Sequence, residues 1–226
     1  ATLKKARHIA EGTRGTYPLT GLIDIEYGEI LLERNELEDA AKYLERGRQT
    51  AGPSWSINNL DGMISLARLQ QTRNDSFGAQ KIIDEAYQMT LSTESSQWYD
   101  VFVSSVAVRL ALMRGDLTAA ERWWVRGGFI DASQAIQLEN YPYHVYEYLA
   151  LTQSRFLLAK GKNLKNGAYY QQALNLLEDL LVEADHFHRI PSKIEILVLQ
   201  ALALNAMKKD GALDTLIQAL AMAEPE

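Results

Sequence analysis

A short apolar motif recurs five times along the chain. In each copy a small residue is followed four positions later by a large apolar residue, and three positions after that by a small or apolar one. The copies are Ala40-Leu44-Gly47, Ala79-Ile83-Ala86, Ala120-Trp124-Gly127, Ala173-Leu177-Leu180 and Ala212-Leu216-Ala219. Steps of four and three keep three residues on one face of an α-helix. We therefore expect the small residue to admit a partner helix and the large one to fill the remaining gap.

Apolar residues recur at spacings of three and four along almost the whole chain, and no stretch alternates strictly with a period of two. This periodicity predicts helices and no strands. The first members of the motif lie 39, 41, 53 and 39 residues apart, so a pair of helices repeats at a nearly constant step. Such a repeat indicates an α-solenoid. The predicted repeats, within a single domain over 1–226, are approximately 17–52, 53–91, 92–130, 141–186 and 190–224.

The turns inside the first three pairs are expected to share one backbone conformation. Asn35, Asn74 and Gly115 lie at equivalent points, where the first helix of each pair ends. Glycine and asparagine tolerate the left-handed conformation that commonly ends a helix. The tripeptide Arg114-Gly115-Asp116 looks in isolation like a cell-adhesion signal, but this placement favours a turn.

Composition excludes several classes of protein. The 226 residues carry a formal net charge of −6 and include no cysteine. The absence of cysteine excludes disulfides and thiolate chemistry, and it is the composition expected of a protein in a reducing cytoplasm. An acidic chain lacks the basic face that nucleic acid requires, and we expect no direct contact with it. No apolar run is long enough to cross a membrane, and no secretory signal is present. The chain opens inside a helical pattern and stops at MAEPE, which predicts a piece of a longer protein whose residues 1–12 are a helix left from a preceding pair.

Three stretches resemble the tetratricopeptide (TPR)-like sensor region of the MalT-like family, the large ATP-dependent LuxR-type regulators. They are PLTGLIDIEYGEILLERNELEDAAKYLERG, RLALMRGDLTAAERWW and IEILVLQALALNAMKKDGALDTLIQALAMAEPE. The resemblance extends from about Tyr17 to Glu226 and implies a right-handed superhelix of about five TPR-like helix-turn-helix repeats. The sequence departs from the family pattern in residues 161–171, expected to lengthen a turn, and in KKDGAL, which looks one residue short.

The resemblance also implies a nucleotide-binding switch module before this segment and a LuxR-type helix-turn-helix after it. This chain holds no phosphate-binding G-x-x-x-x-G-K-[ST] motif, so ATP is expected only in a flanking domain and no cofactor in this segment. The implied role is to receive a small-molecule inducer or a regulatory protein. The signal would pass to other domains of the same chain and promote self-association.

The sequence offers no support for catalysis or metal binding. His186 and His188 lie two residues apart, but a metal site needs further ligands, and Asp185 is the nearest obvious carboxylate. A polar loop between helices is the favoured interpretation. His8 and His144 stand alone, and no Ser/His/Asp grouping follows from the spacing, so we expect no enzyme.

Three arginines lie six residues before the predicted turn positions of successive pairs, which are Asn74, Gly115 and Gly161. Stacking of the repeats predicts that these arginines form a ladder. They are Arg68, Arg109 and Arg155, in the first helix (helix A) of their pairs, and Glu29 holds the corresponding place in the first pair. Helix A lines the concave surface of TPR-like solenoids, so the ladder is able to bind a carboxylate or a phosphate. The favoured alternative is one structural ion pair per repeat. Its acids would lie on the second helices (helix B): Glu45, Asp84, Glu121 or Asp179.

Aromatic residues gather in the third and fourth repeats. Trp98 and Tyr99 open one helix A, and Tyr146 and Tyr148 belong to the next. Such side chains suit flat ligands, sugars or the apolar anchor of a partner, although packing between helices is the default role. Two functions therefore remain open: a signal-sensing domain, and a TPR scaffold that binds an extended peptide or protein without an inducer.

Overall fold

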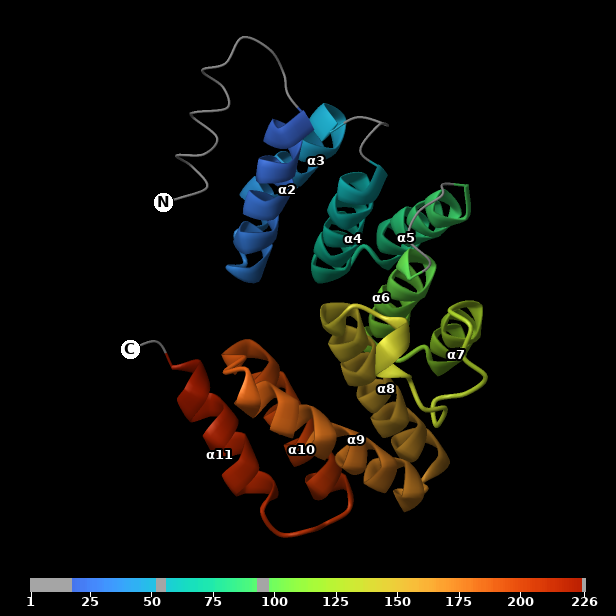
Figure 1. Ribbon diagram of the computed structural model, residues 1–226, viewed down its shortest axis with the longest axis vertical. Helices are drawn as coiled ribbons and strands as arrows, with labels where there is room; N and C mark the ends of the chain where they lie inside the picture. Colours follow the sequence, from blue (N-terminus) through green and yellow to red (C-terminus); the bar gives the residue numbers. More distant parts are fainter. Residues whose placement is uncertain (1–17, 52–55, 93–97, 225–226) are drawn as a thin grey trace. The chain divides into compact units, whose positions relative to one another are not determined.

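The computed structural model describes residues 18–51, 56–92 and 98–224, and within these ranges every regular element is a helix (Figure 1). The helices are α2 (Pro18–Glu33), α3 (Leu37–Ala51), α4 (Ser56–Thr72), α5 (Ser76–Ser92), α6 (Tyr99–Met113), α7 (Leu117–Arg126), the short 3₁₀ helix η2 (Leu138–Asn140), α8 (Tyr143–Leu164), α9 (Gly167–His186), α10 (Ile190–Ala206) and α11 (Ala212–Ala223). The helix predicted for residues 1–12 lies outside the described residues.

The helices pack in adjacent pairs, which confirms the predicted all-α helical repeat. The pairs are α2–α3, α4–α5, α6–α7, α8–α9 and α10–α11. The chain divides into two compact units: unit 1 is Ala1–Val103 and unit 2 is Ser104–Glu226. Each unit is described by itself, and the right-handed superhelix stays a prediction.

The recurring apolar motif forms the core of the first four pairs. Ala40 and Leu44 are fully buried, and the motif residues of α5, α7 and α9 are buried to the same degree. The helices approach closely: a Cβ added to Gly28 would lie 2.7 Å from the side chain of Leu44, and one added to Gly47 would lie 2.7 Å from Ile25. Small residues on one helix thus make room for large ones on its partner, as the sequence predicts.

The fifth copy of the motif is only partly covered. Ala219 is buried, whereas Ala212 and Leu216 are half-buried. Leu213 and Ile217, on the outer side of α11, are 68% and 53% exposed. Within the described residues of unit 2, no helix covers this side of α11, so the last pair lacks the neighbour from its own unit that buries the motif in the pair before it.

The predicted turns are confirmed as one repeated structure. Asn35, Asn74 and Gly115 have φ values of 60°, 62° and 74°. At each, two backbone hydrogen bonds close the helix end in a Schellman motif; for example, the amide of Gly115 donates to the carbonyl of Leu112 at 3.0 Å. Asp116 then caps α7, because its carboxylate accepts from the amide of Ala119 at 2.9 Å.

The lengthened turn predicted for residues 161–171 is wrong. Residues 161–171 do not lengthen a turn: they extend α8 and α9, which meet at Lys165 (φ 51°) and the next residue alone. Gly161 lies inside α8, where an added Cβ would be 2.7 Å from the ring of Tyr170, so close packing replaces the expected loop. The turn in KKDGAL is longer than the others, since it holds two left-handed residues, Lys208 and Gly211.

The long connection between α7 and α8 is fixed to the helices beside it. The indole N–H of Trp124 donates to the carbonyl of Asp131 at 2.7 Å. The buried amide of Gln153 donates to the carbonyls of Ala132 and Gln134, at 2.8 and 2.7 Å. These bonds satisfy backbone groups that this irregular segment leaves without partners of its own.

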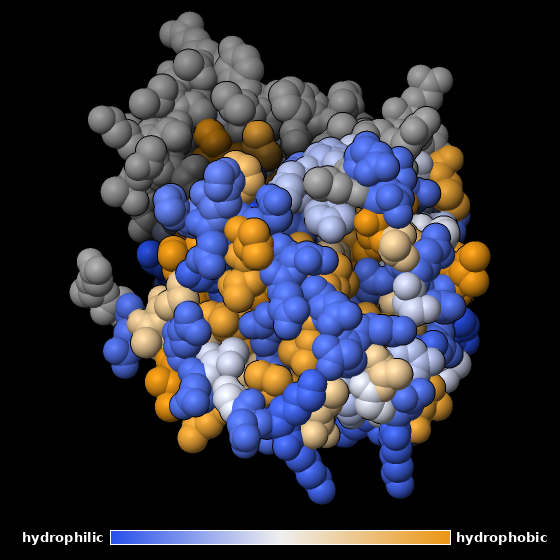
Figure 2. Space-filling view, turned by 60° about the horizontal axis from the view of Figure 1, so that its bottom comes forward, coloured by the Kyte–Doolittle hydropathy of each residue, from blue (hydrophilic) through white to orange (hydrophobic). Residues whose placement is uncertain are grey.

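Hydrophilic side chains are frequent on the face seen in Figure 2, with apolar ones between them. Among the described residues, no helix has both the length and the apolar character required to cross a bilayer.

Candidate functional site

Arg109 of α6 is fixed on three sides by groups of unit 2. Its Nε donates to the hydroxyl of Thr152 at 2.7 Å, and its Nη2 donates to the carbonyl of Tyr148 at 3.2 Å. Its Nη1 lies 3.1 Å from a carboxylate oxygen of Glu195, and its guanidinium carbon lies 3.8 Å from the centre of the Tyr148 ring. The side chain is only 17% exposed. Hydrogen bonds, an ion pair and a cation–π contact together hold this guanidinium in one position.

Arg155 of α8 reaches the same carboxylate. Its Nε and Nη2 donate to Oε1 of Glu195 at 3.2 and 3.1 Å. Two guanidinium groups, from α6 and α8, thus converge on one oxygen of α10, and we call Arg109, Arg155 and Glu195 the arginine cluster. Two positive charges face one negative charge, which leaves the cluster with an excess positive charge.

A second polar network lies where α8 and α10 begin. Arg189 donates from Nε to Glu147 at 3.1 Å and from Nη2 to the hydroxyl of Tyr143 at 2.5 Å. Ser192 donates to the other oxygen of Glu147 at 2.9 Å. Burial, reinforced by the negative charge of Glu147, raises the pKa of Tyr143 to about 12. The phenol therefore stays protonated at neutral pH and serves as a hydrogen-bonding group.

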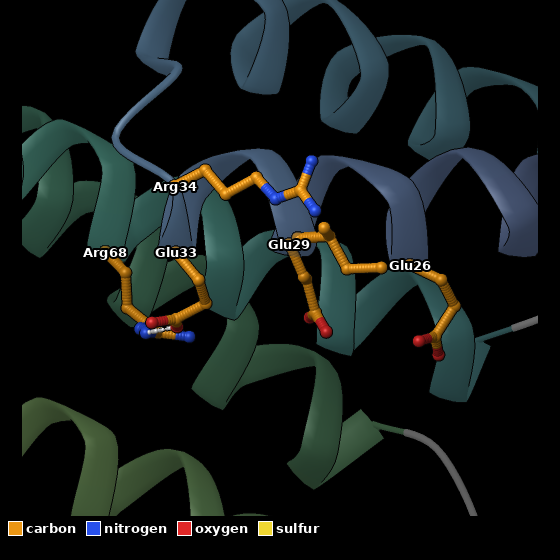
Figure 3. Close-up of a pocket in the computed structure, with 6 residues that line it drawn as sticks. Glu26, Glu29, Glu33, Arg34 and Arg68 are labelled. Atoms are coloured by element: carbon orange, nitrogen blue, oxygen red, sulfur yellow. Dashed lines mark hydrogen bonds and ion pairs between the residues drawn. The ribbon is translucent and has the colours of Figure 1, made fainter. Parts of the chain in front are cut away.

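Unit 1 presents an acidic groove on its own helices A. A hollow of about 340 Å³ is lined by Glu26, Glu29, Ile30 and Glu33 of α2, Arg34 of the turn that follows it, and Arg68 of α4 (Figure 3). Arg68 forms an ion pair with Glu33, and both side chains are substantially exposed. Three carboxylates and two guanidinium groups give this groove an excess of negative charge.

Two carboxyl groups of unit 1 are held away from water. Burial raises the pKa of Asp61 to about 7, and the negative charges of Glu29 and Glu26 add to the effect. Burial also raises the pKa of Glu29, against the lowering effect of the hydrogen bond that it accepts from the buried hydroxyl of Ser65. Unit 1 therefore keeps carboxyl groups where their charged form is disfavoured.

The aromatic residues proposed for the site have different surroundings. Tyr99 is buried at 6% exposure, and half-buried Trp98 stacks on it with ring centres 4.1 Å apart. Tyr146 is half-buried in α8, 6.2 Å from Tyr143 by ring centres. Tyr148 lies under Arg109. Of the four, only Tyr148 directly touches the arginine cluster.

The structure brings together two of the three predicted arginines, Arg109 and Arg155, and places Arg68 in unit 1. All three arginines form ion pairs with acidic residues, Glu33 and Glu195. These acids lie on helices A, so the expectation that they would lie on helices B is wrong. The reason is lateral reach: the side chain of Arg68 extends from α4 to α2, and those of Arg109 and Arg155 extend to α10, so each meets an acid of another helix A. Arg155 also stands ten residues before the left-handed Lys165, not six before a turn at Gly161 as the predicted spacing required.

Residues that sequence reasoning missed include Glu195, Thr152 and Glu147 of unit 2 and Asp61 of unit 1. One signal was present for Glu195: it follows Arg155 by 40 residues, close to the repeat step. Nothing in the sequence marks Asp61, because its raised pKa depends on burial.

His186 ends α9, and His188 lies in the turn that follows it. His188 has a φ of 52°, His186 contacts the ring of Phe187, and Asp185 pairs with Lys193. Over residues 18–51, 56–92 and 98–224 no three His, Cys, Asp or Glu side chains are grouped so as to hold a metal ion. His8 lies outside those ranges.

Comparisons with known proteins give one family. The family model of the MalT-like TPR region matches residues 1–226. No curated protein and no solved structure matches the chain.

Proposed function

The chain belongs to the MalT-like TPR region family, and from this membership we propose that it is the signal-receiving region of a cytoplasmic, ATP-dependent LuxR-type transcriptional regulator. The family match over the whole of residues 1–226 is the observation that carries the proposal. In this proposal ATP binds a flanking domain, and the segment itself binds no cofactor and catalyses no reaction. TPR-like helical repeats typically present a surface to a partner.

The proposed signal binds the helix A side of unit 2, where Arg109 and Arg155 meet Glu195 and Tyr148 lies against Arg109. An inducer or a regulatory protein that binds there more tightly in one arrangement of the full-length protein shifts the population toward that arrangement. Polar groups fixed by several partners support this role, because they lose little freedom when a ligand binds.

Thermal unfolding of the protein with a panel of sugars, organic acids, sugar phosphates and nucleotides tests the proposal. A ligand of the native state raises the melting temperature in a concentration-dependent manner. We expect Arg155→Gln to abolish that rise and Glu178→Gln, an exposed change on helix B, to retain it. A ligand whose effect survives Arg155→Gln would contradict the location.

In the full-length regulator, the same pair of variants is tested by transcription from its target promoter. We expect Arg155→Gln to lower the induced level at least several-fold without lowering the amount of protein, and Glu178→Gln to leave it unchanged. Equal induction by the two variants would place the receiving surface elsewhere.

The acidic groove of unit 1 favours a second candidate, a scaffold that binds an extended cationic peptide. Carboxylates along α2 beside the exposed Ile30 offer charge and apolar contact together. Fluorescence anisotropy with a lysine-rich labelled peptide tests it. Binding that Glu26→Gln weakens, with no response to any metabolite, would favour the scaffold over the inducer.

A further inference from the structure

We propose that the arginine cluster is an anion-binding site now occupied by the carboxylate of Glu195, and that a dianionic ligand bearing phosphate or two carboxylates takes its place. The inference deepens the proposed function by naming the chemical class of the effector at that site. It concerns Arg109, Arg155 and Glu195 alone.

Charge is the first argument. Glu195 supplies one negative charge to two guanidinium groups, and all three donors that reach it converge on Oε1. Among the described residues Oε2 of Glu195 accepts no hydrogen bond. A single carboxylate therefore leaves one positive charge without compensation, whereas a dianion neutralises both guanidinium groups.

Preorganisation is the second argument. Thr152 and Tyr148 hold Arg109 in place independently of Glu195, since its Nε and Nη2 are bonded to α8. If the carboxylate moves away, this guanidinium keeps its position, and its Nη1 stays beside the vacated oxygen site. Fixed donors bind an anion at a smaller cost in side-chain entropy than mobile ones do.

Access is the third argument. The side chain of Arg155 is 41% exposed and that of Glu195 is 28% exposed, so the oxygen site opens to solvent. Nη1 of Arg155 has no hydrogen-bond partner within the described ranges and is available to a further oxygen. The ion pair between Arg155 and Glu195 is partly exposed, and such pairs contribute little to stability, so the carboxylate of Glu195 is able to leave Arg155 without unfolding the unit.

The test removes the internal occupant. Glu195→Gln takes away its charge, and Glu178→Gln makes the same change in net charge at an exposed site of α9. Inorganic phosphate and succinate are titrated separately at constant ionic strength, with chloride as the balancing anion. The readout is the NMR signal of the Arg155 Nε–H group, assigned by its disappearance in Arg155→Gln.

We expect saturable shifts in Glu195→Gln, with an affinity about tenfold higher than in the wild type or in Glu178→Gln, because a nearby like charge has been removed. The double variant Glu195→Gln/Arg155→Gln is followed through the NMR signal of the Arg109 Nε–H group. We expect this variant to lose the gain in anion affinity that Glu195→Gln shows. Tighter binding of phosphate than of succinate assigns a phosphate-bearing ligand, and the reverse assigns a dicarboxylate.

Equal affinities in Glu195→Gln and Glu178→Gln, or no saturable shift in the former, would overturn the proposal. Glu195→Asp is the reserve if Glu195→Gln does not fold: it retains the charge but withdraws the carboxylate, and a gain in affinity over the wild type is again required. Loss of this anion site with an intact, Arg155-dependent metabolite response would overturn the inference and leave the receiving role standing. Loss of both the anion site and the metabolite response would overturn the inference and the proposed receiving role together.

Discussion

The helices A of the two units carry opposite excesses of charge on the same type of repeat. In unit 1, three carboxylates and two guanidinium groups line the acidic groove, and Asp61 has a pKa raised to about 7. In unit 2, two guanidinium groups share the single carboxylate of Glu195. The apolar motif that builds each pair is alike in both units. The repeat therefore fixes the packing, and the residues outside the motif are free to determine what each surface attracts.

Of the substitutions that compare the two units, Glu147→Gln in unit 2 is expected to change the free energy of unfolding most. Glu147 is 14% exposed and accepts from both Arg189 and Ser192, so an amide in its place directs N–H donors at existing donors. We expect a loss of about 3 kcal/mol in the free energy of unfolding, measured with denaturant. Glu178→Gln is the control, and equal losses in the two variants would show that this network contributes no stability.

Asp61→Asn in unit 1 is expected to act in the opposite direction. The folded pKa of Asp61 is raised from 3.8 to about 7, so its charge destabilises the fold progressively as pH rises from about 4 to about 7 and fully above that range. A rise in pKa from 3.8 to about 7 corresponds to about 4 kcal/mol. Because the half-buried side chain keeps part of its contact with water, we expect removal of the carboxylate to stabilise the protein by about 2 kcal/mol at pH 8 and by almost nothing at pH 4. Denaturation at both pH values checks this, with the exposed Glu85→Gln as control. A gain that does not depend on pH would contradict the assignment to ionisation.

A smaller contrast is expected between matched arginine substitutions. Arg109→Met removes a guanidinium with three partners at 17% exposure and should cost about 1.5 kcal/mol of stability. Arg68→Met removes an exposed ion pair and should cost less than about 0.5 kcal/mol. Thermal unfolding of the two variants compares them directly, and an equal loss would mean that the partners of Arg109 add nothing to its effect.

Much of the fold follows from local sequence. The spacing of Ala40, Leu44 and Gly47 predicts the buried face of α3, and Asn35 predicts the left-handed end of α2. Both depend on neighbours a few residues away. The extension of α8 through Gly161 was missed because glycine disfavours a helix interior, while the contact with Tyr170 that requires it is tertiary.

The candidate site was predictable only in part. Arg109 stands out because it lies six residues before the turn at Gly115, whereas Arg155 lies ten residues before its turn at Lys165. The acid that both arginines meet depends on how far side chains reach between helices. The separation of 40 residues between Arg155 and Glu195 shows that the repeat step also pairs charges between neighbouring helices. Burial of Asp61 has no counterpart in any local pattern, because three-dimensional packing alone removes its water.

The central claim, that one repeated fold presents surfaces of unlike electrostatic character, is tested most directly by titration of Asp61. Carbon-detected NMR of its side-chain carboxyl, assigned with Asp61→Asn, follows ionisation as pH is raised. Burial among the negative charges of unit 1 predicts a midpoint at about pH 7. A midpoint near pH 4, the ordinary value for an aspartate in water, would contradict the account.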